Sequence, residues 1–317
     1  MNDIDHYIKA GTRDNTRRAY QSAVHHFEVE WGGFLPATSD MVARYLVNYA
    51  DSLSINTLKL RLAGLAQWHN DQGMPDPTKT PIVRKVLKGI RALHPAQEKQ
   101  AKPLQLDQLE KVVAWLDEEL SLAARIGNRQ LILKYSRDRA IILVGFWKGF
   151  RSDELSRLDV DFMQLIPSEG LEFFLPFSKG DRESKGQIFK IPALLKLCPV
   201  EAVADWLEVS GISSGPLFRR VTRWGNLGED SLHPSSFIPL LKSLFSLANV
   251  QDASEYSSHS LRRGFASWAT DNNWDLKSLM QHVGWKDMRS AMRYLPVSDP
   301  FSDMRSKPLL VVPHDKS

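Results

Sequence analysis

Cysteine is nearly absent from this chain, and its scarcity excludes two common ways of stabilising a protein. Cys198 stands alone among 317 residues, so no disulfide can form within one chain and no cysteine-based zinc site can be assembled. A lone cysteine also fits a reducing compartment. His25 and His26 are adjacent rather than four residues apart, which makes them a poor metal pair. We therefore expect neither a metal centre nor another cofactor.

Long apolar runs are missing as well. No stretch approaches ~18 uncharged apolar residues, the length needed to cross a bilayer. The chain starts with Met-Asn-Asp-Ile-Asp-His, which is polar and acidic, unlike a signal peptide. A glycine-rich phosphate-binding loop is not found either. These absences predict a cytoplasmic protein without a membrane partner.

What the chain does carry is a mild excess of positive charge. Its 41 Lys and Arg residues outnumber its 37 Asp and Glu residues, for a formal net charge of +4, and its isoelectric point is about 9.0. This balance favours a polyanionic partner, although many ordinary enzymes share it. A length of 317 residues suffices for roughly two domains, each with its own core.

The first part of the chain has the apolar periodicity of helices separated by short breaks. We expect helices over residues 12–30, after a cap at Ser39 or Asp40, after Ser54, and over residues 82–93. The polar, proline-flanked residues 95–103 are typical of an extended linker. The pattern predicts an all-helical first domain, residues 1–94, that precedes this linker.

After the linker, residues 104–300 predict a second domain of α+β type. Its helices are expected over residues 106–122, 136–148, 194–209, 235–248, 261–270, 276–283 and 288–295. Three β-rich runs, residues 162–166, 171–177 and 188–191, predict a small sheet with a basic loop before its last strand. The fold class is therefore mainly α with a small antiparallel β-sheet. In the C-terminal tail, residues 301–317, an apolar run packs either on its own chain or on a neighbouring subunit.

One set of side chains in the second domain has the chemistry needed to break a phosphodiester. Arg151, in Gly-Phe-Arg-Ser-Asp-Glu-Leu, and Arg262, in His-Ser-Leu-Arg, offer planar, permanently charged forks for phosphate oxygens. Tyr294 offers a phenol as the nucleophile. His259, three residues before Arg262, lies on the same helical face and is suited to accept the phenol proton.

Three further residues complete this set. Lys179, at the tip of the predicted hairpin, is suited to protonate a departing 5′-oxygen. Trp285 has only its indole N–H to donate, which suits a phosphate oxygen. Glu154, one turn after Arg151, is placed to support an arginine or the histidine.

Taken singly, each of these residues has an ordinary explanation. A helical arginine is usually a solvated surface residue, and a tryptophan after a glycine more often belongs to a core than to an active site. Lys185 competes with Lys179 for the hairpin role, and Tyr256, just before the histidine motif, is a rival nucleophile. Only the ordered set indicates chemistry.

In order and context, the set resembles the active site of the tyrosine recombinases, also called phage integrases. The family's succession of Arg, hairpin Lys, His-x-x-Arg, Gly-His/Trp and Tyr is matched by Arg151, Lys179, His259, Arg262, Trp285 and Tyr294. Most members carry a second histidine where this chain has tryptophan, and in this respect the chain is similar to the Cre-like recombinases. Segments of the first domain also resemble the family's core-binding domain, so the resemblance covers residues 12–296.

The resemblance implies a site-specific DNA recombinase. Tyr294 would attack the scissile phosphate to give a 3′-phosphotyrosyl bond and a free 5′-hydroxyl, without metal or ATP. The partner would be double-stranded DNA with an inverted-repeat site of about 30 base pairs. Four copies of the protein would hold this DNA as a tetramer, and the protein would be a monomer in free solution. A telomere resolvase, a type IB topoisomerase-like enzyme and a DNA-binding protein that does not cut remain as alternatives.

Positive charge gathers in the first domain, where such DNA would need a surface. Residues 55–93 contain seven basic and two acidic side chains. Some of the basic residues are spaced three and four apart on one helical face, for which a solvated surface is the ordinary alternative. We expect DNA contact, weakened by salt, from the basic residues of these helices: Arg17, Lys59, Arg61, Arg84, Lys85, Lys88 and Arg91.

Overall fold

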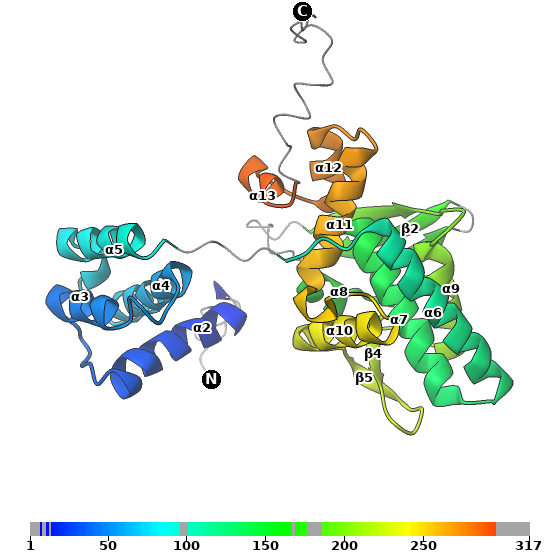
Figure 1. The fold of residues 1–317 in the computed structure, drawn as a ribbon. Helices are drawn as coiled ribbons and strands as arrows, with labels where there is room; N and C mark the ends of the chain where they lie inside the picture. Colours follow the sequence, from blue (N-terminus) through cyan, green and yellow to red (C-terminus); the bar gives the residue numbers. More distant parts are fainter. Residues whose placement is uncertain are drawn as a thin grey trace, which may run out of the picture. The chain divides into compact units, whose positions relative to one another are not determined.

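The computed structural model describes residues 7, 11, 12, 14–95, 101–166, 169–176 and 186–295. The chain divides into two compact units, Met1–Lys99 and Gln100–Ser317 (Figure 1). Each unit has a hydrophobic core of its own. No helix among the described residues is both long and apolar enough to cross a membrane.

The regular elements in the described part of the first unit are all helical. Its elements are α2 (Asp14–His25), which continues into the π-helical turn η1 (His26–Glu30), then α3 (Ser39–Asn48), α4 (Ile55–Asp71), the 3₁₀ turn η2 (Pro77–Lys79) and α5 (Pro81–Leu93). The apolar stripes of these helices meet in a core around Phe27, Tyr45 and Leu65. The sequence therefore predicted these helices correctly, although the first ends in a π turn.

Two helix starts in this unit show how capping decides a boundary. The Ser54 hydroxyl accepts the backbone N–H of Thr57 (3.1 Å), as expected for the cap of α4. The expected cap of α3 at Ser39 or Asp40 is wrong. Thr38 is the cap, because its hydroxyl accepts the backbone N–H of Met41 (3.2 Å) while its own backbone is extended.

The second unit is built around a long central helix. Its helices are α6 (Leu106–Arg125), α7 (Arg129–Lys148), α8 (Ser152–Ser156), α9 (Pro199–Ser210), α10 (Phe237–Leu247), α11 (Ser258–Asp271), α12 (Leu276–Val283) and α13 (Met288–Met292). Short 3₁₀ turns connect some of them: η3 (Val160–Phe162), η4 (Pro234–Ser236) and η5 (Ala253–Glu255). Residues 140–150, which end α7 and follow it, are all buried. A helix end buried on every side lies at the centre of a domain, and α6 and α11 lie beside α7 (Figure 1).

Three strands form the predicted antiparallel sheet. They are β1 (Met163–Ile166), β2 (Gly170–Leu175) and β3 (Gln187–Pro192), in the order β1-β2-β3. Phe173 pairs with Met163 on one side and with Phe189 on the other. A second hairpin, β4 (Arg219–Val221) with β5 (Leu227–Ser231), was not predicted. Both of its strands are short and polar, so they lack the alternation that reveals a strand.

Two glycines allow α7 and α11 to pack closely. A Cβ atom on Gly145 would lie 2.8 Å from a methyl carbon of Leu261. A Cβ atom on Gly264 would lie 2.0 Å from the Leu104 carbonyl oxygen and 2.9 Å from the Phe146 ring. Both approaches are too short for any side chain. This close packing brings the residues after α7 next to the start of α11.

Candidate active site

Arg151 lies in a tight connection between two helices. α7 ends at Gly149, which adopts the left-handed conformation (φ 64°, ψ 34°) that glycine tolerates best. Arg151 then occupies the N-cap position of α8. Its backbone N–H donates to Glu154 Oε2 (2.8 Å), so a carboxylate at the third helical position closes the turn. The motif Gly-Phe-Arg-Ser-Asp-Glu therefore folds as a helix end followed directly by a helix start.

Glu154 joins the two arginines. Its Oε1 accepts Nη1 of Arg151 (2.8 Å), and its Oε2 accepts Nη1 of Arg262 (3.3 Å), although the two arginines lie 111 positions apart in the sequence. Glu154 is 3% exposed and Arg262 is fully buried. One buried carboxylate thus fixes both guanidinium groups.

Arg262 is also held by two backbone carbonyls. Its Nη1 donates to the Gly149 oxygen (3.0 Å) and its Nη2 to the Val283 oxygen (3.3 Å). Burial lowers the pKa of Arg262 to about 10, while the Glu154 carboxylate opposes this shift. The guanidinium therefore keeps its positive charge at neutral pH.

Tyr294 lies beside Arg262, Trp285 and His259. Its hydroxyl is 3.1 Å from Nδ1 of His259, which comes from the first turn of α11. Its ring stacks on Trp285 (centroids 5.2 Å apart, planes at 30°), and the Arg262 guanidinium lies 5.5 Å from the Tyr294 ring centroid. His259 is exposed and Tyr294 is half-buried. The phenol oxygen is therefore next to a base at the surface of the unit.

Two N–H donors of this site have no partner. Among the buried side-chain polar atoms of the described residues, Nε of Arg262 and Nε1 of Trp285 make no hydrogen bond. The Arg262 guanidinium lies 5.1 Å from the Trp285 ring centroid, so both donors belong to the same site. Unsatisfied buried donors are costly and need an explanation. Oxygens of a bound phosphate would satisfy them.

The structure thus brings Arg151, Glu154, His259, Arg262, Trp285 and Tyr294 together. Lys179 and its competitor Lys185 lie outside the described residues. Tyr256, the rival nucleophile, is fully buried, and its hydroxyl donates to Gln108 Oε1 (3.0 Å). Sequence reasoning missed Arg263, whose Nη1 donates to the carbonyl oxygen of Arg293, the residue before Tyr294 (2.9 Å). Nothing in the sequence distinguishes that arginine from its neighbours.

In the first unit, the basic residues differ in their surroundings. Five of them are exposed: Lys59, Arg84, Lys85, Lys88 and Arg91. Arg61 instead donates to the Ser22 hydroxyl (3.0 Å), and Arg17 donates to Asp14 (3.1 Å) and to the Thr12 carbonyl oxygen (2.9 Å). The exposed face of α5 lies opposite the buried Val83 and Ile90.

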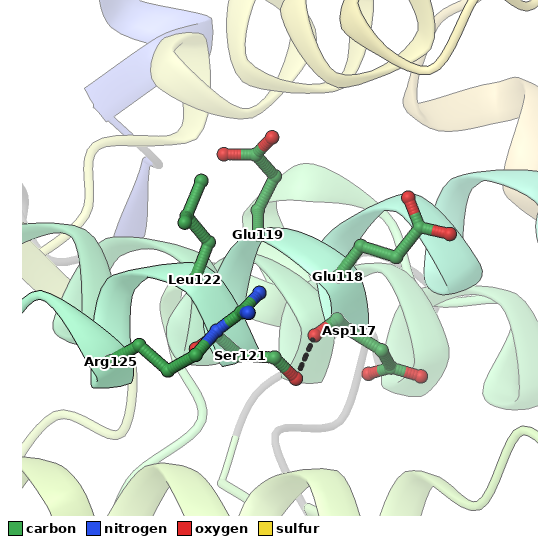
Figure 2. A pocket seen from close by; sticks show the side chains of 6 residues that line it. All are labelled: Asp117, Glu118, Glu119, Ser121, Leu122 and Arg125. Atoms are coloured by element: carbon green, nitrogen blue, oxygen red, sulfur yellow. Dashed lines mark hydrogen bonds between the residues drawn. The ribbon is translucent and has the colours of Figure 1, made fainter.

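Two other features of the described residues do not form a site. No group of three His, Cys, Asp or Glu side chains in the part of the chain that the structure describes is arranged to hold a metal ion. A shallow hollow on α6 is lined by side chains of that helix alone, among them Asp117, Glu118 and Glu119 (Figure 2). Ser121 there donates to the Asp117 carbonyl oxygen (2.9 Å). Three carboxylates in one hollow disfavour the binding of a phosphate group there.

Residues 124–299 match the phage integrase family, and the chain belongs to that family. The matched range contains the whole candidate site. Fold and site together therefore define a protein of the tyrosine recombinase class.

Similar recombinases support this assignment. The chain is 28% identical over 306 residues to the integrase/recombinase xerD homolog of Selenomonas ruminantium, a match that covers 93% of this chain and 85% of the relative. It is 26% identical over 167 residues to the tyrosine recombinase XerD of Staphylococcus haemolyticus, covering 51% of this chain and 50% of the relative.

Solved structures show the same fold. The Tn1549 transposon integrase in complex with transposon right end DNA has a TM-score of 0.62 at 12% identity, with 95% of each chain covered. The XerH site-specific recombinase bound to palindromic difH substrate has a TM-score of 0.59 at 18% identity, with 88% of this chain and 75% of that chain covered.

Proposed function

We propose that this site-specific recombinase cleaves and rejoins DNA through Tyr294. The phenol oxygen attacks the scissile phosphate, the bond from phosphorus to the 5′-oxygen breaks, and a 3′-phosphotyrosyl bond forms. His259 Nδ1 accepts the phenol proton, and the 5′-oxygen leaves as a hydroxyl after it receives a proton. The observation that carries this proposal is the Tyr294 hydroxyl 3.1 Å from His259 and above a guanidinium that Glu154 holds in place.

The arginines stabilise the charge that develops on the phosphate. Arg151 is partly exposed and Arg262 is buried, so one reaches a bound phosphate from the surface and the other from beneath. Preorganised donors of this kind lower a barrier without reorganisation during the reaction. The covalent intermediate retains the energy of the phosphodiester, so attack by another 5′-hydroxyl rejoins a strand without ATP.

Lys179 remains our proposed donor of the proton to the 5′-oxygen. An ammonium group placed near the leaving oxygen is suited to general acid catalysis. Lys179 precedes β3 in the sequence, and Phe189 of β3 lies against Gly284, the residue before Trp285.

The DNA partner is expected to contact both units. The exposed basic face of α5 is suited to phosphate contacts that position a duplex without reading its sequence. The names of the similar structures, which are recombinases and integrases bound to DNA, support a DNA partner. We further propose an inverted-repeat site, a tetramer on DNA and a cytoplasmic location.

A nicked suicide duplex tests the proposed function. The duplex would carry a site selected from random DNA by binding to the full chain. A nick close to the scissile phosphate lets the short fragment with the newly formed 5′-hydroxyl diffuse away, so that the strand cannot be rejoined. Wild-type protein is expected to accumulate a covalent adduct whose phosphotyrosyl peptide, identified by mass spectrometry, contains Tyr294. Tight binding without any adduct would instead show a DNA-binding protein that does not cut. Relaxation of supercoiled DNA without exchange of strands would indicate a topoisomerase.

Trp285→Phe should give a mild loss of activity. The substitution keeps a ring to stack on Tyr294 and removes the unpaired indole N–H. Loss of a single hydrogen bond to a charged oxygen should slow single-turnover cleavage about tenfold. Binding of duplex DNA, measured by fluorescence anisotropy, should stay within about twofold. A variant with the wild-type cleavage rate would contradict the role of the indole N–H.

A further inference from the structure

Lys148, the last residue of α7, has an unusual environment for a lysine. Its side chain is 3% exposed. Its Nζ donates to the carbonyl oxygen of Lys190 on β3 (3.0 Å) and lies 5.4 Å from the centroid of the Phe189 ring. Within the described residues, no carboxylate lies within 4.0 Å of this ammonium group. The contacts of Lys148 are thus a carbonyl dipole and a ring face rather than an opposite charge.

A lysine at this position carries a cost that an apolar residue would avoid. Burial lowers the pKa of Lys148 to about 7, because the charged form loses its hydration. A methionine would fill a similar space without that penalty. The proposed cleavage chemistry does not use Lys148, so its burial needs another reason.

The neighbours of Lys148 supply that reason. The carbonyl of the residue before it, Trp147, accepts Nε2–H of His282 on α12 (2.7 Å). The carbonyl of the residue after it, Gly149, accepts the guanidinium of Arg262 on α11 (3.0 Å). Three consecutive residues therefore anchor α12, β3 and α11 to the end of α7.

The strand that Lys148 holds also touches the turn that carries Trp285. A Cβ atom on Gly284 would lie 2.9 Å from the Phe189 ring and 3.1 Å from Gln187 Nε2, both on β3. Movement of β3 away from α7 would therefore disturb both the turn after α12 and the Gly149 carbonyl. Lys148 lies between these two sets of contacts, at the end of α7 and against β3.

We propose that Lys148 is a positioning residue for strand cleavage: its buried hydrogen bond to β3 sets the segment that presents Arg151 and holds Arg262. This role rests on the proposed function. It concerns the rate of cleavage rather than the affinity for DNA, because Lys148 is buried beneath the site.

The groups that face Lys148 determine which charge in this region changes near pH 7. His282, on α12, has its pKa lowered to about 4 by burial and by the charge of Lys148, so it is neutral at pH 7. From β3, the facing groups are the Lys190 carbonyl and the Phe189 ring, while the Lys190 ammonium pairs with Glu172 instead. From α11, Arg262 meets the Gly149 carbonyl and keeps its charge. Lys148 is therefore the group among these that titrates near pH 7.

Lys148→Met tests the inference, with Lys190→Ala as the matched control. The methionine removes the ammonium and keeps the volume, whereas the control removes an exposed ammonium on β3 and leaves the backbone carbonyl in place. At saturating suicide substrate, Lys148→Met should slow single-turnover cleavage about 10- to 100-fold, as expected for a small misplacement of catalytic groups. The dissociation constant of Lys148→Met for duplex DNA should stay within about twofold of wild type. In Lys190→Ala, both the cleavage rate and the dissociation constant should stay within about twofold of wild type.

The dependence of the unfolding free energy on pH supplies a second readout. The pKa of Lys148 is about 7 in the folded chain and 10.5 in its ordinary state, so between these values the unfolded chain binds the additional proton. Stability therefore rises with pH in that window. Relative to Lys148→Met, wild-type protein should gain stability from pH 7 to pH 10 in denaturant titrations.

The outcomes separate the two claims. Wild-type cleavage by Lys148→Met would overturn the positioning role, and so would a variant that loses folding, DNA affinity and cleavage together. A wild-type chain that forms no Tyr294-dependent adduct would instead refute the proposed function, and with it the role of Lys148.

Discussion

Tyr294→Phe is expected to abolish the covalent protein–DNA adduct while leaving the fold and duplex binding intact. The substitution removes the oxygen that we propose as the nucleophile, together with its contact with His259 Nδ1 (3.1 Å). The phenylalanine ring still stacks on Trp285 and still covers Arg262. The lost hydrogen bond is at the surface, so the free energy of unfolding should change by less than about 1 kcal/mol.

The measurement is denaturing electrophoresis of the suicide-substrate reaction, with DNA affinity and unfolding measured on the same preparations. Tyr256→Phe is the matched control, since its hydroxyl bonds Gln108 in the interior and its ring is fully buried. That control should form adduct at the wild-type rate. An adduct that persists in Tyr294→Phe would show that another residue is the nucleophile.

Local signals in the sequence predicted most helices because a helix depends on residues three and four apart. They were less successful where a boundary depends on a single contact. α7 starts at Arg129 rather than at residue 136, because Asn128 accepts the backbone N–H of Leu131 (3.1 Å) and caps the helix. α9 starts at Pro199 rather than at residue 194. Proline at the first helical position is a start signal that the apolar pattern obscured.

The site shows the same division between local and distant contacts. The spacing of His259 and Arg262 on one helical face is local, and so is the pairing of Arg151 with Glu154. Full burial of Arg262 and its bonds to the Gly149 and Val283 carbonyls depend on how α7, α11 and α12 pack. Periodicity carries no information on such packing. The buried Lys148 was missed for that reason, because a lysine at a helix end is ordinarily a solvated partner of the helix dipole.

We propose that Arg262 binds the scissile phosphate, and the structure shows that it also makes buried contacts within the fold, so its replacement should affect both cleavage and stability. Arg262→Ala leaves the Gly149 and Val283 carbonyls without their donor, and Glu154 keeps only its contacts with Arg151. Breaking a buried ion pair costs about 3–5 kcal/mol of unfolding free energy. Cleavage should fall at least about 1000-fold, since a phosphate donor is lost as well.

Arg262→Lys separates these two roles. A lysine retains the positive charge and one bond to Glu154 or to a carbonyl, so it should recover part of the stability. It cannot reproduce the planar fork, and its cleavage should stay about 100-fold or more below wild type. Arg139→Ala is the control, because that arginine pairs with Asp117 (2.7 Å) and Asp205 (3.4 Å), from α6 and α9, and none of the three belongs to the site. It should cleave DNA normally. If Arg262→Lys cleaved DNA at the wild-type rate, positive charge alone would suffice at this position. The proposal that the planar guanidinium of Arg262 is needed to bind the phosphate oxygens would then be wrong.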